Sequence, residues 1–92
     1  MQFATSVMGA EQRHLEAVVE LLPGADSGLV GDWLAQRGLA TAALMVGLLA
    51  TGSAAAMRAA FGSEEAPAVP EALRAHVRSV AIVPPRRLHA SE

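Results

Sequence analysis

Three features of the 92-residue sequence predict an α+β fold. Apolar residues alternate with other residues near both ends, over 2–8 and 77–83, as in strands. Apolar residues recur at helical spacing over 11–22 and 53–61, and the stretch 39–51 between the helices is typical of short strands. The resulting order, β-α-β-β-α-β, predicts a ferredoxin-like arrangement: an antiparallel sheet with both helices on one face and the other face left for solvent or a partner.

The first two expected elements are a strand over Gln2–Met8, ended by Gly9, and a helix over Glu11–Leu22. The helix prediction depends on an apolar stripe at positions i, i+3, i+4 and i+7. The stripe consists of Leu15, Val18, Val19 and Leu22. Pro23-Gly24 then stops the helix, because proline cannot continue it and glycine favours a turn.

The middle of the chain predicts a short helix followed by paired strands. Asp26 or Ser27 caps the helix, which ends near Gln36 with Gly38 in the position of a C-terminal glycine. The next stretch, residues 39–51, is apolar, and its glycines favour two short strands or one long bent strand over one buried helix. Because no charge occurs over residues 38–57, a single membrane-spanning helix is the alternative for this part of the chain.

The last elements are a capped helix, one helical turn and a strand. Ser53 caps a helix that runs through Phe61 and ends at Gly62, with Met57, Ala60 and Phe61 facing inward. Pro70-Glu71 begins one turn that carries Leu73, and Val77–Val83 is the final strand. Pro84-Pro85 ends strand pairing because neither residue can donate a ladder hydrogen bond. We therefore expect one domain over residues 1–83 and a tail over 84–92.

The composition excludes several functional classes. Without cysteine or lysine, the chain has no disulfide, thiolate or Schiff-base chemistry. Only three residues are aromatic, so we expect an aliphatic core in which Trp33, Met45 and Met57 also pack. Residues 71–92 carry four arginines against two acids, but no aromatic residue is interleaved with them, and no nucleic-acid partner is predicted.

No group of residues predicts catalysis, a metal or a cofactor. His14 with Glu11 or Asp26, and the adjacent acids Glu64-Glu65, are interpreted as solvated surface residues. Ser53 is explained by its capping role, and the glycines of residues 47–53 lack the lysine of a phosphate-binding loop. We therefore expect a cofactor-free protein that is not an enzyme.

Three runs between residues 30 and 80 follow a pattern of cap, turn and core residues. They are Val30-x-x-Trp33-Leu34-x-x-Arg37-Gly38-Leu39, Gly52-Ser53-Ala54-Ala55-x-Met57-x-x-Ala60-Phe61-Gly62-Ser63 and Val69-Pro70-Glu71-Ala72-Leu73-x-x-His76-Val77-x-x-Val80. In order and spacing these runs resemble the propeptide of sedolisin-type (pro-kumamolisin-like) serine peptidases. The chain departs from that pattern in a shorter hairpin between Gly38 and Gly52, a reduced insert at residues 64–68, and the lack of a following peptidase domain.

The resemblance implies a ferredoxin-like fold and a role as peptidase inhibitor or folding assistant. It implies that the sheet docks on the enzyme while the C-terminal segment enters the enzyme's cleft. The segment expected to bind a partner here is Val83, Pro84, Pro85, Arg86, Arg87, Leu88 and His89. A proline-stiffened arm loses less entropy on binding than a flexible one, and Arg86 and Arg87 suit acids in a cleft.

A second resemblance implies self-association instead. Gly52-Ser53 with an alanine-rich helix, followed by Ser79–Pro84, is similar to the end of a bacterial microcompartment shell domain, which implies a structural hexamer. The lysine-alanine-alanine run of that family is replaced here by Leu22-Pro23-Gly24. The leading hypothesis is therefore a non-catalytic module that binds a protein, for which a serine peptidase is the candidate. Self-assembly and a small membrane protein are the alternatives.

Overall fold

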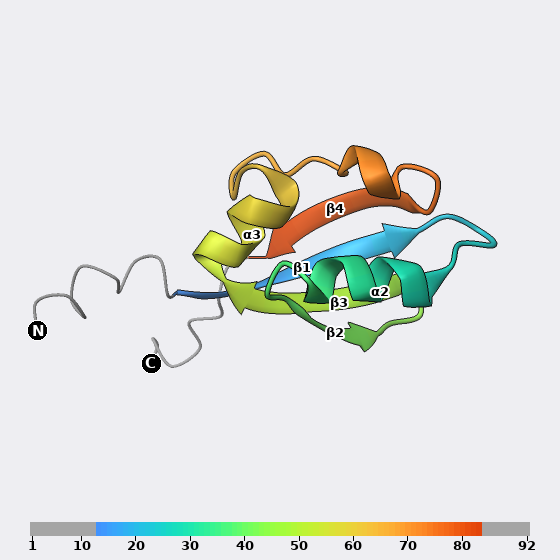
Figure 1. Cartoon of the computed structure of the whole chain (residues 1–92), viewed down its shortest axis with the longest axis horizontal. Helices are drawn as coiled ribbons and strands as arrows, with labels where there is room; N and C mark the ends of the chain where they lie inside the picture. The colour runs from blue at the N-terminus through green and yellow to red at the C-terminus, as the bar shows by residue number, and fades with distance from the viewer. Residues whose placement is uncertain (1–12, 84–92) are drawn as a thin grey trace, which may run out of the picture.

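The computed structural model of the chain describes residues 13–83, which form an α+β fold. The elements are β1 (His14–Leu21), α2 (Ser27–Ala35), β2 (Ala40–Ala43), β3 (Gly47–Ser53), α3 (Ala54–Phe61), the 3-10 turn η1 (Glu71–Leu73) and β4 (Val77–Val83). The four strands pair antiparallel in the order β2-β3-β1-β4, and both helices lie on the same side of the sheet (Figure 1). This β-α-β-β-α-β order confirms the predicted ferredoxin-like arrangement.

The first strand corrects a prediction, because residues 14–21 form β1 and the helix expected over 11–22 is wrong. Leu15 and Val19 belong to the predicted helical stripe, yet both also fit a period of two with Ala17 between them. Those three residues are buried, whereas His14 and Glu16 on the alternate positions are exposed. Alternation with two adjacent valines favours a strand. The strand predicted over residues 2–8 lies outside the described residues.

The predicted helix ends are confirmed by side-chain caps and glycine turns. The Asp26 carboxylate accepts a hydrogen bond of 3.0 Å from the Leu29 backbone N–H at the start of α2. The Ser53 hydroxyl accepts one of 3.1 Å from the Ala56 N–H at the start of α3. Gly38 and Gly62, which follow the two helices, have φ values of 92° and 87°, a region that only glycine enters without strain.

Residues 38–57 form β2, β3 and the first turn of α3, so one helix across this stretch is wrong. Among residues 13–83, no helix is long and apolar enough to cross a membrane. Met45 and Val46 make a two-residue turn, closed by Leu44 and Gly47, each of which donates its backbone N–H to the carbonyl of the other. The tight turn explains how two strands fit between α2 and α3.

The hydrophobic core fills the space between the sheet and the two helices. Its fully buried members come from every layer: Ala17, Val19, Val30, Leu34, Ala50, Ala54, Met57 and Leu73. Trp33 packs against this core from α2, as predicted. Met57 is buried as expected, but Met45 is fully exposed at the hairpin turn, so its prediction as a core residue is wrong.

Candidate interaction surfaces

The sheet face opposite the helices has no covering element among the described residues. On β1, Leu15, Ala17 and Val19 point into the core, so Val18 points to this open face. Val18 is opposite Leu49 on β3 and Ala81 on β4, and Leu49 is opposite Ala42 on β2. These four residues form one apolar row across all four strands, which we call the open-face row.

Two glutamates of β1 flank the open-face row. Glu16 precedes Val18 by two positions, and Glu20 follows it by two, so both point to the open face. The Ser79 hydroxyl donates a 3.2 Å hydrogen bond to Glu20, and Arg78 Nε lies 3.6 Å from the other Glu20 oxygen. The open face therefore combines an apolar row with acidic groups at either side.

Of the predicted partner-binding residues, only Val83 lies in the described part of the chain. It ends β4, is opposite Glu16 on the open face, and is 37% exposed. Pro84, Pro85, Arg86, Arg87, Leu88 and His89 lie outside the described residues. Val83 connects the open face directly to the C-terminal segment.

The turn between β2 and β3 is a second apolar surface, and the sequence did not predict it. Leu44, Met45 and Val46 are consecutive, and all three are exposed. A shallow hollow of about 530 Å³ lies between this turn and residues 20–25. Three exposed apolar side chains in a row are unusual at a turn, where polar residues are common.

The charged residues outside the sheet stabilise loops. Arg13 donates to both oxygens of Glu64, at 2.9 and 2.6 Å, and Arg58 lies 3.8 Å from the same carboxylate. Glu64 therefore joins the loop after α3 to the start of β1 in an ion pair at the surface. His76 Nδ1 accepts a 3.1 Å hydrogen bond from the Asp26 N–H, which holds the β1–α2 loop against the segment before β4.

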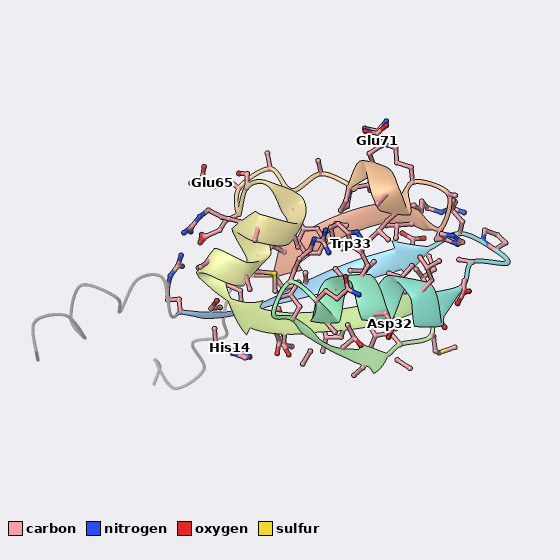
Figure 2. All side chains as sticks on the ribbon, in the orientation of Figure 1. His14, Asp32, Trp33, Glu65 and Glu71 are labelled. Atoms are coloured by element: carbon pink, nitrogen blue, oxygen red, sulfur yellow. The ribbon has the colours of Figure 1, made fainter. Side chains whose placement is uncertain are left out.

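Ionisable side chains are spread over the molecule. In Figure 2, His14 lies at one end of the sheet and Asp32 on α2, while Glu65 lies on the loop after α3 and Glu71 on η1. Residues 13–83 contain no group of three or more histidines and acids that could hold a metal ion. Next to the C-terminal end of α2, the Arg37 guanidinium lies 3.5 Å from the centre of the Trp33 ring, in a cation–π contact.

Comparisons with known proteins add no relative. No family model, no curated protein and no solved structure matches this chain.

Proposed function

We propose that the chain is a non-catalytic protein-binding module that docks on a peptidase through its open sheet face. One observation supports this above the others: the apolar open-face row crosses four paired strands, with no element over it among residues 13–83. A rigid, half-apolar sheet face presents contact area without the entropy cost of ordering loops. Apolar surface that a fold leaves uncovered is typical of interaction sites.

The residues that resemble the serine-peptidase propeptide support the fold part of this proposal. In the first run Val30 and Leu34 are buried and Gly38 has a positive φ. In the second run Ser53 caps α3, and Met57 is buried. Packing and capping already require these residues, so the matched runs support a shared fold. They support a peptidase partner only indirectly, through that fold. The peptidase as partner is thus the more specific part of the proposal.

The position of Val83 suits the second contact that the resemblance implies. β4 ends on the open face, and the chain continues from there into Pro84 and Pro85. A partner docked on the open face would therefore contact Val83, the residue that precedes the C-terminal segment in the sequence. The acidic groups Glu16 and Glu20 favour a partner surface with basic or hydrogen-bond-donating groups around an apolar centre.

Inhibition of a sedolisin-type serine peptidase tests the proposal. Purified chain at micromolar concentration should inhibit the peptidase in its acidic working range. The informative variant is Ala81→Arg, because Ala81 is exposed in the open-face row and an arginine there places a charge in the interface without filling the core. We expect the inhibition constant to rise about tenfold or more.

The matched control is Leu29→Arg, which places the same charge at a 44% exposed position on α2, on the opposite side of the molecule. It should leave the inhibition constant unchanged. A peptidase that keeps full activity with the wild-type chain would contradict the proposal. Equal effects of both variants would contradict the open face as the docking surface.

A further inference from the structure

The outer edge of β2 is uncovered among residues 13–83. There, β2 lies at the end of the sheet order and pairs only with β3. Its four residues, Ala40–Ala43, are all exposed, and none is charged or is proline. Edge strands of soluble proteins usually carry a charge, a proline or a bulge that prevents pairing with another strand. β2 has none of these.

The opposite edge of the sheet differs in this respect. β4 carries Arg78, and its pairing with β1 has a register irregularity between Glu20 and Leu21. Arg78 also lies close to Glu20, so it is placed beside the strand edge. A charge and a bulge are two devices that block strand addition. Within the described part of the chain, one edge of the sheet is therefore protected and the other is open.

The free backbone groups of β2 belong to two residues. Leu44 and Gly47 exchange both backbone hydrogen bonds, so the groups of Leu44 point toward β3. Direction alternates along a strand, and Ala42 therefore also points its groups toward β3, whereas Thr41 and Ala43 point theirs outward. Each of these two residues offers one N–H and one C=O along the open edge.

We propose that β2 pairs antiparallel with β2 of a second copy of this chain, which makes one continuous eight-stranded sheet. A two-fold axis at Ala42 places Thr41 opposite Ala43 of the second copy. Both residues of each such pair point their backbone groups at the other, so the two pairs form four hydrogen bonds. An axis at Thr41 would instead require the N–H of Leu39, which already donates to Leu34.

The lack of charged residues along β2 favours a second copy of this chain as the partner at its outer edge. A two-fold axis puts Ala42 opposite its own equivalent and the residues beside it close to theirs, so a charge near the axis would lie near a like charge. No charge occurs from Gly38 to Met57, a stretch that includes all of β2 and its turn. In this register Leu44, which is 39% exposed, comes to lie over Ala40 of the second copy. The pairing thus covers part of the exposed turn.

The position of helix α2 is compatible with the two-fold axis at Ala42. A Cβ added to Gly31 would lie 3.5 Å from the Thr41 hydroxyl, so Gly31 is on the flank of α2 above β2. Gly28 and Ala35, at three and four residues from Gly31, share that flank. With strands ~4.8 Å apart and α2 above β2 and β3, the two copies of α2 would lie ~10 Å apart. Gly28, Gly31 and Ala35 are small enough for this distance, and the exposed Asp32 beside Gly28 and Ala35 is the charge that the two copies bring toward each other.

Light scattering and sedimentation of the whole chain test the proposal. The wild-type chain should be a dimer at micromolar concentrations. Ala42→Arg and Ala42→Asp should each weaken the dimer roughly tenfold or more, since each places like charges opposite one another at the axis. Mixing the two variants in equal amounts should restore a dimer, because arginine then faces aspartate across the axis.

The matched control is Ala81→Arg, which puts the same charge on an exposed alanine of the open face at the other edge of the sheet. It should dimerise like the wild type, and circular dichroism should show that all variants are folded. A wild-type chain that stays monomeric at 100-micromolar order would overturn the proposal. So would a hexamer, or a failure of the mixed variants to pair.

Discussion

The substitution Gly47→Ala tests the tightest backbone approach in the sheet. A Cβ at Gly47 would lie only 2.1 Å from the Val19 carbonyl oxygen and 3.0 Å from the Leu21 backbone N. Ordinary van der Waals contact begins near 3.4 Å, so β1 and the start of β3 must separate by more than 1 Å. Both obstacles are backbone atoms of a central strand, which cannot rotate away as a side chain can.

The free energy of unfolding should fall by about 3 kcal/mol. Overpacking a well-packed site costs about 1–3 kcal/mol. Separation of the strands also weakens the 3.0 Å hydrogen bond from the Leu21 N–H to the Val46 carbonyl, a loss of about 1 kcal/mol. A domain of this size is stable by roughly 5–10 kcal/mol, so the variant should lose a large part of its stability.

Urea unfolding followed by circular dichroism measures the effect, at one protein concentration for all variants. The control is Gly24→Ala, where φ is +79° and no atom lies within 4 Å of the added Cβ. That variant bears only the strain of a left-handed alanine, about 1–2 kcal/mol. If Gly47→Ala loses no more stability than Gly24→Ala, then β1 does not approach the hairpin as closely as described.

Three further predictions concern single side chains. Met57→Ala should lower the free energy of unfolding by about 2–5 kcal/mol, because Met57 is fully buried. Met45→Ala at the exposed turn should change it by less than about 0.5 kcal/mol. Thermal unfolding of the two variants measures the difference. Ser53→Ala removes the cap of α3 and should cost about 1 kcal/mol in the same assay, with Ser53→Asp restoring most of it. Arg37→Gln removes the stacked guanidinium and should cost about 0.5–1 kcal/mol; Trp33 is the only tryptophan, so its fluorescence emission should change as well.

The parts of the fold that depend on local signals could be predicted from the sequence. Asp26 or Ser27 as a cap, Ser53 as a cap, and glycines after both helices were correct because capping involves residues only a few positions apart. The last strand was correct because Pro84-Pro85 limits it and its apolar residues alternate.

The error at residues 11–22 has a physical reason. Leu15 and Val19 are four positions apart, a separation that suits both a helix face and a strand face. Ala17 distinguishes the two, since it is fully buried in β1, but a small residue gives little signal on its own. The β-α-β-β-α-β order still holds, because β1 supplies the first strand and the short helix expected after Asp26 or Ser27, now α2, supplies the first helix. Pairing between distant segments, β1 with β3 and β4, decides in favour of the strand.

The exposed turn could not be predicted because its residues carry no turn signal. Leu44, Met45 and Val46 are apolar, and none of them is glycine, proline or asparagine. The open-face row depends on register across four strands, which a single sequence does not specify. Both surfaces therefore follow from tertiary structure alone.

The most direct test is a nuclear Overhauser measurement on isotope-labelled chain at Val18. The β1–β3 register places Val18 opposite Leu49 in a pair that exchanges no hydrogen bonds, where the two Cα atoms are about 4.5 Å apart. A strong signal between their Hα protons is expected, together with contacts from Val18 to Ala81. A run of strong sequential amide–amide signals across residues 14–21, typical of a helix, would contradict the sheet, its open face and its unprotected edge.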